Sequence, residues 1–324
     1  MPDILRFDNF RLDLQDDEGR RYNLLDDISF TLPEGKALGI VGESGCGKSI
    51  TSLAVMRLLP AAARVTGGSV SLKGMDLMSK TPKEMGDIRG RDVAMVFQDP
   101  MTCLNPVLTI GLQIGEAIRR HNPQMAEPEL KAATLELLHK VGIPNPEKRM
   151  KNYPHQFSGG MRQRTMIAMA IACSPALLIA DEATTALDVT IQAQVLDLMV
   201  RLKEGGSLMF ITHNLGIVAE VCDEVTVMYA GQIVEAGTVE EVFLHPAHPY
   251  TKGLLLALPT LRSKGNTLYN IPGVVPTVRN FTPGCRYAPR CDYKLPVCSE
   301  RKPARCVLND RHHAACYLYE EVMA

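Results

Sequence analysis

The sequence lacks an excess of charge, a long hydrophobic run and a signal-like beginning, and each absence narrows the possible functions. Lys and Arg (35) nearly balance Asp and Glu (36), so a net charge of −1 provides no overall attraction to nucleic acid. The longest apolar stretch, Ile167–Ala180, is interrupted by Ser174-Pro175 and is too short to cross a bilayer. The first residues, MPDILRFDNFRLDLQDDEG, are polar and acidic, unlike a secretory signal. We therefore expect a cytoplasmic protein, which leaves docking on a membrane protein open.

Internal repeats are also absent, which predicts one catalytic unit rather than two. Apolar residues make up 46% of the chain and charged residues 22%, a composition typical of soluble globular proteins. Buried-strand patterns such as ALGIVG and ALLIADE alternate with helical patterns, and residues 100–175 are mainly helical. After Pro246 prolines recur and periodicity fades. The sequence predicts an α/β fold followed by a separate tail.

The stretch GESGCGKS, Gly42–Ser49, matches the phosphate-binding pattern G-x-x-x-x-G-K-S between a predicted strand and a predicted helix. Glycines allow backbone N–H groups to surround phosphates, and the helix N-terminus adds partial positive charge. Lys48 is expected to reach the β- and γ-phosphates and to act in catalysis, and the Ser49 hydroxyl is expected to bind Mg²⁺. The predicted nucleotide-binding residues here are Gly42, Ser44, Gly45, Gly47, Lys48, Ser49 and Thr51.

Two further stretches complete the expected site. In ALLIADE, Asp181 ends a buried strand and is expected to bind Mg²⁺, and Glu182 is placed to orient or deprotonate the attacking water. In QFSGGMRQR, the turn Ser158-Gly159-Gly160 precedes a helix whose N-terminus can hold an anion. Because the first loop already cradles one nucleotide, this second turn is expected to bind the nucleotide of another subunit.

GESGCGKS, Gln98 in VFQDP, FSGGM, LLIADE, TALD and ITH occur in the order typical of ABC-type ATPases, and the chain resembles the nucleotide-binding subunit of an ABC transporter from about residue 4 to 258. The resemblance implies a P-loop NTPase fold of ABC type, with a RecA-like core, an antiparallel β subdomain and an inserted helical subdomain. It also implies that two subunits stack head to tail around ATP. Gln98 would sense Mg²⁺, Asp188 would lie at the dimer seam, and His213 would contact the γ-phosphate.

The sequence departs from the family pattern at three places. Met161 follows the Ser-Gly-Gly turn where glutamine is usual, and Ala183 follows Glu182 where proline is usual. No charged catalytic group is lost, so ATP hydrolysis is expected. The adenine-stacking aromatic of the family would fall near Leu14 or Gln15, neither of which is aromatic. Tyr22 is a nearby substitute, and a core or cross-strand tyrosine is the alternative role for it.

The segment HPAHPYTKGLLLALP and the cysteine-containing tail resemble the ATPases of dipeptide, oligopeptide and nickel importers. This resemblance implies import of small peptides, with nickel or another small solute as the alternative. The implied partners are two membrane permeases, a second related ATPase forming a heterodimer, and an extracytoplasmic substrate-binding protein. The implied location is the cytoplasmic face of the cell membrane. We expect an ABC ATPase domain over 1–258, with a helical subdomain over about 99–175, and a small Cys-rich extension over 259–324.

Cysteines are concentrated in this extension. Cys46, Cys103, Cys173 and Cys222 are scattered and expected to be reduced, and the other five are Cys285, Cys291, Cys298, Cys306 and Cys316. No two of the five have the C-x₂₋₄-C spacing of a zinc knuckle, whereas four widely spaced thiolates suit a 4Fe–4S cluster with a structural role. The importer resemblance implies Cys285, Cys291, Cys298 and Cys316 as ligands. Spacing alone leaves Cys306 as a possible fourth ligand, and zinc or buried free thiols as alternatives.

A soluble ABC ATPase acting on nucleic acid or ribosomes is the alternative of another class. Residues 279–313 hold eight Lys and Arg against three Asp and Glu, which could form a nucleic-acid footprint. DNA-repair members of the superfamily carry long coiled coils or zinc insertions, and ribosome-bound members carry two ATPase units on one chain. This sequence has neither, so we expect a transporter subunit with no nucleic-acid partner.

Overall fold

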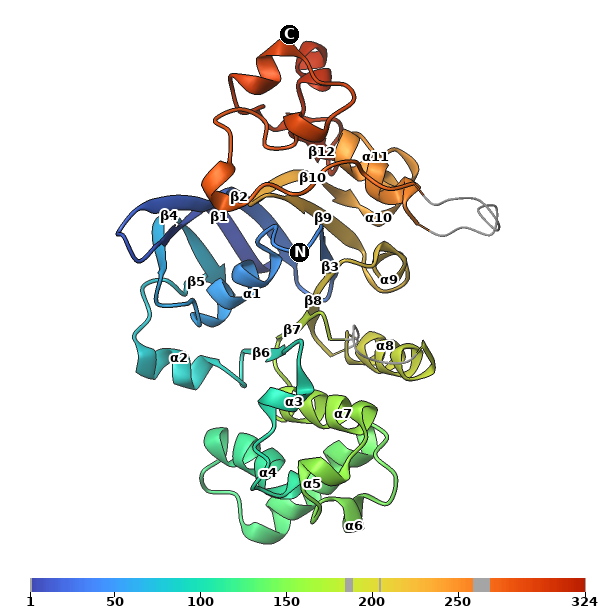
Figure 1. Cartoon of the computed structure of the whole chain (residues 1–324). Coiled ribbons are helices and arrows are strands. Elements are labelled where there is room, and N and C mark those ends of the chain that lie inside the picture. Colours follow the sequence, from blue (N-terminus) through green and yellow to red (C-terminus); the bar gives the residue numbers. More distant parts are fainter. Residues whose placement is uncertain (1, 184–188, 204, 259–268, 324) are drawn as a thin grey trace. The chain divides into compact units, whose positions relative to one another are not determined.

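The computed structural model describes residues 2–183, 189–203, 205–258 and 269–323 (Figure 1). The chain forms two compact units. The first consists of residues 1–4, 33–36 and 79–209, and the second of residues 5–32, 37–78 and 210–324. Strand β8 (Ser207–Thr212) begins in the first unit and ends in the second.

The first unit is largely helical. Its main elements are α2 (Pro82–Ile88), β6 (Val93–Val96), α3 (Pro100–Cys103), α4 (Ile110–His121), α5 (Glu127–Lys140), α6 (Pro146–Arg149), η1 (Pro154–Gln156), α7 (Gly159–Ala170), β7 (Leu177–Asp181) and α8 (Val189–Lys203). Helix α4 packs against α5 and α7 (Figure 1), and its Ile110, Ile114 and Ile118 are buried because residues four apart share one helix face. Strands β6 and β7 are parallel, with Val96 opposite Ala180.

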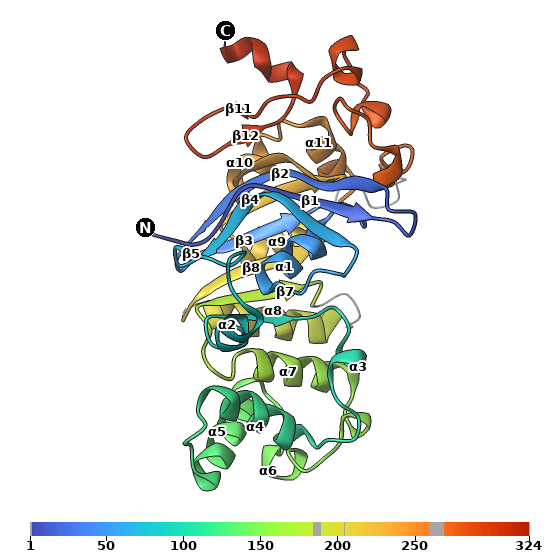
Figure 2. The same ribbon diagram turned by 90° about the vertical axis from the view of Figure 1, so that its left-hand side faces the viewer.

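The second unit begins with a four-stranded sheet in the order β2-β1-β4-β5, whose strands are β1 (Asp3–Gln15), β2 (Arg21–Pro33), β4 (Ala63–Leu72) and β5 (Met75–Asp76). Figure 2 shows β1, β2 and β4 side by side. The pairs β1–β4 and β4–β5 are antiparallel. Alternating apolar side chains turn to one face, where the rings of Phe7 and Phe30 stack 4.6 Å apart.

A second sheet carries the phosphate loop. In this unit the strands lie in the order β11-β12-β10-β9-β3, formed by β3 (Ala37–Val41), β9 (Glu224–Tyr229), β10 (Gln232–Thr238), β11 (Cys306–Val307) and β12 (His313–Ala314). Strand β3 is parallel to β9, and β10 is antiparallel to both β9 and β12. The unit's helical segments are α1 (Lys48–Met56), α9 (Leu215–Val221), α10 (Val239–Leu244), α11 (Pro249–Leu256), η3 (Val278–Asn280), η4 (Ala288–Arg290), η5 (Pro296–Ser299) and η6 (Tyr317–Met323). The C-terminal residues thus return to the sheet through β12.

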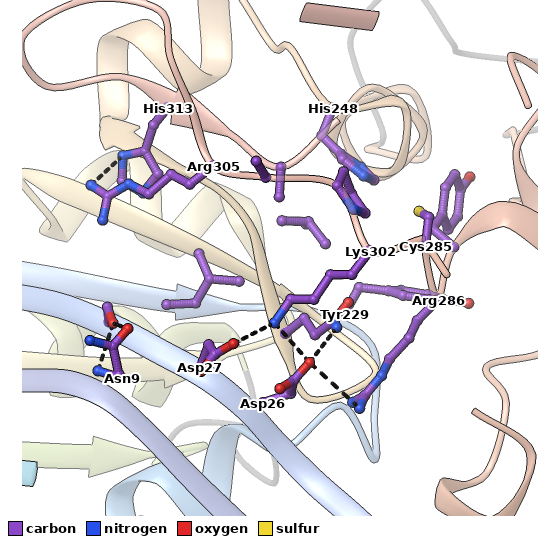
Figure 3. Close-up of a pocket in the computed structure, with 18 of the residues that line it drawn as sticks. Asn9, Asp26, Asp27, Tyr229, His248, Cys285, Arg286, Lys302, Arg305 and His313 are labelled. Atoms are coloured by element: carbon purple, nitrogen blue, oxygen red, sulfur yellow. Dashed lines mark hydrogen bonds and ion pairs between the residues drawn. The ribbon is translucent and has the colours of Figure 1, made fainter. Parts of the chain in front are cut away.

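Ion pairs and hydrogen bonds hold the C-terminal region, residues 269–323, against the rest of the second unit. The Lys302 ammonium lies 2.8 Å from Asp26 and 3.0 Å from Asp27, both on β2 (Figure 3). The fully buried Glu235 carboxylate on β10 lies 2.7 Å from His312 Nε2. Glu235 also accepts hydrogen bonds from the backbone N–H groups of Ala247 and His248. The tail is therefore anchored by buried polar contacts as well as by strand pairing.

No helix in the described part of the chain has the length and apolar character needed to span a membrane.

Candidate functional site

The predicted phosphate loop has the backbone that its glycines permit. It connects the fully buried β3 to α1, and Gly47, at the N-cap of α1, has a φ of +101°. Gly42 has a φ of +155°, and a Cβ there would collide with the carbonyl oxygen of Met228. Side chains would be excluded at these positions, so the loop presents backbone N–H groups at the start of a helix.

Two polar side chains from α1 fold back onto this loop. Lys48 is only 4% exposed, and its ammonium donates hydrogen bonds to the carbonyl oxygens of Gly42 at 2.7 Å and Glu43 at 3.0 Å. The buried Thr51 hydroxyl donates to the Gly47 carbonyl at 3.0 Å, so it stabilises the turn from inside. Ser44, Gly45 and Ser49 are exposed and accessible to a ligand. Burial raises the pKa of the Cys46 thiol, which favours its neutral form.

In the first unit, the ends of two parallel strands bring Gln98 and Glu182 together. Gln98 Nε2 donates a hydrogen bond to Glu182 Oε2 at 2.8 Å. Each residue lies two positions after a member of the Val96–Ala180 pair, so the strand register explains the contact. Asp181 ends β7 and is buried. The arrangement places an amide and two carboxylates at one strand edge, a donor set that suits Mg²⁺ and an activated water.

The Ser158-Gly159-Gly160 turn opens α7, also in the first unit. Ser158 is the N-cap of this 12-residue helix, and its hydroxyl accepts a hydrogen bond from the Met161 N–H at 3.3 Å. Phe157 is buried and anchors the turn, whereas Ser158 and Gly159 are exposed. No atom lies within 4 Å of the position that a Gly159 Cβ would take. The turn therefore offers an open helix N-terminus to an anion.

The remaining predicted nucleotide contacts differ in their surroundings. His213 is exposed directly after β8. Tyr22 on β2 is half-buried; its hydroxyl lies 3.2 Å from Asp16 Oδ2, and the Arg279 guanidinium lies 5.6 Å from its ring centre. Arg279 thus approaches the ring of Tyr22, the aromatic side chain predicted to stack on adenine. Asp188, predicted for the dimer seam, lies outside the described residues.

Four of the five tail cysteines line one small cavity in the second unit, namely Cys285, Cys291, Cys298 and Cys316. Cys306 does not line it: its thiol lies 3.7 Å from the Ala304 carbonyl oxygen and 3.8 Å from that of Cys316. Burial raises the pKa of Cys285 and that of Cys316 to about 11, so without a cation both thiols stay protonated. Among the described residues no three His, Cys, Asp or Glu form a group that could hold a metal ion, so the predicted 4Fe–4S cluster is not confirmed.

Three tyrosines beside the phosphate loop were not singled out from the sequence. Tyr229, Tyr250 and Tyr287 are buried, and their ring centres lie 4.7 to 5.4 Å apart. The Tyr250 hydroxyl accepts a hydrogen bond from the Glu43 N–H at 2.8 Å. The three residues come from β9, α11 and the tail, so no local pattern could have brought them together.

A second cavity of about 500 Å³ separates β2 and β10 from the C-terminal region (Figure 3). Asp26, Asp27, Arg286, Lys302 and Arg305 are among its lining residues. Most of these charges are paired across it, as in the contact of Lys302 with both aspartates. Because most of these charged side chains already have partners within the chain, we do not assign the nucleotide site to this cavity.

Comparison with known proteins agrees with these features. Residues 25–185 match the ABC transporter family, and residues 234–298 match the C-terminal region of oligopeptide/dipeptide transporters. The dipeptide transport ATP-binding protein DppD of Bacillus subtilis is 50% identical over 297 residues, covering 91% of this chain and 88% of that protein. The oligopeptide transport ATP-binding protein OppD of the same organism is 50% identical over 295 residues, covering 90% and 82%.

Among solved structures, the dimeric ATP-binding cassette MJ0796 bound to ADP and Pi superposes with a TM-score of 0.65. The match covers 72% of this chain and 98% of the cassette at 24% identity. This likeness confirms the predicted ATPase fold, while the tail with its cysteines lies outside what it supports.

Proposed function

The chain belongs to the family of ABC transporter ATP-binding proteins and is an ATPase, and on that premise we propose that it drives the import of small peptides across the cytoplasmic membrane. The observation that carries the proposal is the similarity of residues 234–298 to known peptide transporters. Residues 234–298 match the C-terminal region of oligopeptide/dipeptide transporters, and relatives named for dipeptide and oligopeptide transport are 50% identical over about nine-tenths of the chain.

Each predicted site residue then has a task. Backbone N–H groups of Gly42–Ser49 would surround the phosphates, and Lys48 would exchange its carbonyl contacts for phosphate oxygens. Ser49, Gln98 and Asp181 would hold Mg²⁺, which when bound neutralises phosphate charge. Glu182 would accept a proton from the attacking water, and His213 would contact the γ-phosphate. Ser158, Gly159 and Gly160 would bind the nucleotide of a neighbouring subunit, with Asp188 at the seam and Tyr22 beside adenine.

The proposed partners are two permeases, a related second ATPase and an extracytoplasmic binding protein, with this chain on the cytoplasmic face of the membrane. The first unit offers a surface for a permease in the helical segment that follows Gln98. Val107 and Leu112 are exposed there, by 76% and 62%, beside a groove of about 1030 Å³ lined by residues of α4 and α5. Exposed apolar side chains around a groove suit the insertion of a partner helix.

Uptake assays test the substrate directly. A strain that lacks this chain should lose uptake of labelled dipeptides, and the gene for the unaltered chain should restore it. A Lys48→Met variant should fail to restore uptake because it removes the phosphate-binding ammonium. Normal dipeptide uptake in the deletion strain, together with lost nickel uptake, would assign the chain to the alternative substrate.

We further propose that Cys285, Cys291, Cys298 and Cys316 bind a 4Fe–4S cluster that stabilises the C-terminal extension over residues 259–324. The support is their convergence on one cavity. Ligands of such a cluster bind different iron atoms and stand further apart than the ligands of a single ion. A bound cluster supplies four covalent links in a region with little regular structure. We also propose that residues 1–258 form the ATPase domain, with a helical subdomain over about 99–175.

Anaerobic purification followed by iron and acid-labile sulfide analysis tests the cluster. Four iron and four sulfide per chain are expected for such a cluster. Cys316→Ser should lower the iron content, whereas Cys306→Ser, the matched control, should retain it because Cys306 lies outside the cavity. Stoichiometric zinc without iron would overturn the cluster, and full iron in Cys316→Ser would reassign the fourth ligand to Cys306.

A further inference from the structure

We propose that Arg290 is a positioning residue for the phosphate loop: its guanidinium holds Glu43 of that loop and so couples the C-terminal region to nucleotide binding. The inference rests on the proposed role of Gly42–Ser49 in binding ATP. It adds a residue that lies 247 positions away in the sequence and outside every ATPase motif.

The contact between the two side chains is bidentate. Arg290 Nη1 lies 2.7 Å from Glu43 Oε2, and Arg290 Nη2 lies 3.1 Å from Glu43 Oε1. Two parallel charge-assisted hydrogen bonds fix the direction of the carboxylate as well as its distance. A lysine in place of Arg290 would supply a point charge without this fork.

The arginine is itself held firmly. Its side chain is 4% exposed, its Nε donates to the Pro272 carbonyl at 2.8 Å, and its Nη2 donates to the Ile271 carbonyl at 3.2 Å. Nη1 lies 3.4 Å from the Tyr229 hydroxyl, and the guanidinium lies 5.8 Å from the centre of that ring. Although desolvation by burial lowers it, hydrogen bonding to Glu43 leaves the pKa of Arg290 above its ordinary value. The guanidinium is thus a fixed, permanently charged anchor.

Glu43 is constrained on both its side chain and its backbone. While Arg290 holds the carboxylate, the Glu43 N–H donates to the Tyr250 hydroxyl and the Glu43 carbonyl accepts from the Lys48 ammonium. Arg290 and Tyr250 both follow the ATPase motifs in sequence. The loop segment that precedes Lys48 therefore takes its position from the C-terminal third of the chain.

The same arginine borders the cysteine cavity. Cys291, the next residue, lines that cavity, and Arg290 ends the short helix η4. Four residues earlier, Arg286 follows the lining residue Cys285 and donates to the Ala230 carbonyl and to Asn23 Oδ1. Two arginines beside cavity cysteines thus contact the β9–β10 turn, β2 and the phosphate loop. The C-terminal region therefore contacts the phosphate loop directly through Arg290, and contacts its neighbouring strands through Arg286.

Removing the Glu43 carboxylate tests the inference most cleanly. Glu43→Ala breaks the ion pair but leaves the contacts of Arg290 with Pro272 and Ile271. The loop would contact the phosphates in both the ground state and the transition state. A misplaced loop should therefore weaken the binding of both states equally. We expect the Kd of the full chain for MgATP, measured by calorimetry, and the KM of the assembled transporter to rise about tenfold. The kcat should change by less than about twofold.

Two arginine variants sharpen the test. Arg290→Met should weaken MgATP binding at least as much as Glu43→Ala, and Arg290→Lys should recover part of the affinity. The double variant should be no weaker than Arg290→Met, since both single variants remove the same ion pair. Arg311→Met is the control, because Arg311 is an exposed tail arginine. Glu43→Ala with unaltered Kd and KM, even if its melting temperature falls, would overturn the inference. Failure of the unaltered chain to bind MgATP would overturn the proposed role of the loop itself, and the inference with it.

Discussion

At Glu182 the backbone has a φ of +46°, a left-handed conformation that costs a non-glycine residue energy. The Glu182 carboxylate accepts a hydrogen bond from the side-chain amide of Gln98. Strained backbone is concentrated at functional sites in proteins, because it is kept there for chemistry and not for stability. The strain at Glu182 therefore agrees with a catalytic role for its carboxylate.

Glu182→Gln should abolish hydrolysis while retaining nucleotide. The amide cannot accept a proton from water, so kcat should fall about a hundredfold or more, as for loss of a general base. MgATP should then accumulate in closed dimers. Phosphate release and light scattering measure the two effects. Turnover close to that of the unaltered chain would mean that another group activates the water.

A second residue-level expectation concerns pH. Burial and the neighbouring Arg305 lower the pKa of His313 from 6.5 to about 4. Below pH 6.5 the unfolded chain binds a proton that the folded chain rejects, so stability falls as pH decreases from 6.5 towards 4. Between pH 7.5 and 5 this residue should account for a loss of about 2 kcal/mol in unfolding free energy.

Urea denaturation at the two pH values, with and without His313→Gln, isolates this contribution. The glutamine retains an acceptor for Arg305 but does not titrate. The pH-dependent loss should therefore be smaller in the variant. Equal losses in the two proteins would assign the pH dependence to other groups.

At the scale of elements, local patterns predicted what local forces determine. The β3–loop–α1 segment and β7 follow from an apolar run next to glycines or acids, because burial and turn geometry act over a few residues. Strands β11 and β12 have two residues each and no alternation, so nothing marks them in the sequence. They form because β12 pairs with the edge of β10, and because His312 contacts the buried Glu235 carboxylate. Glu235 and His312 are 77 positions apart in the sequence.

Glu235→Gln should loosen this C-terminal edge. The carboxylate is fully buried and accepts hydrogen bonds from His312, Ala247 and His248. A glutamine presents an NH₂ group to donors, which should cost about 3 kcal/mol of unfolding free energy. Glu240→Gln, an exposed position on α10, is the control and should change stability by less than about 0.5 kcal/mol. Hydrogen exchange at residues 306–314 should quicken only in the first variant.

The β6 end offers a test of coupling between elements. Gln98→Ala removes the contact with Glu182 and precedes the helical segment proposed to face the permeases. We expect transport per ATP hydrolysed to fall more than MgATP affinity does. The ratio is measured in vesicles that contain the complete transporter, with peptide uptake and phosphate release followed together. A normal ratio would remove Gln98 from the coupling role.

For the whole molecule, the predicted site residues fall into two sets. Lys48 and its loop belong to the second unit, while Gln98, Asp181, Glu182 and the Ser158 turn belong to the first. The order of the motifs along the sequence was sufficient to predict the ATPase fold. The Glu43–Arg290 pair was beyond such prediction because neither residue belongs to a pattern that names the other.

Under the proposed function the Ser158–Gly160 turn binds the nucleotide of a neighbouring subunit. We therefore expect the purified chain alone to bind MgATP and to hydrolyse it slowly. Specific activity should rise with protein concentration and rise further when the related ATPase is added. Light scattering during the assay reports the oligomeric state. Full turnover by a strict monomer would contradict the shared site.

The complete lack of tryptophan makes the tyrosine cluster an optical reporter. With no indole to receive excitation energy, ultraviolet emission comes from nine tyrosines, three of which touch one another beside the phosphate loop. A single tryptophan at Phe281, whose ring lies 4.1 Å from the Arg286 guanidinium, would be the only one in the chain. The wavelength of its emission maximum would report whether the C-terminal region stays packed against the sheet when nucleotide binds.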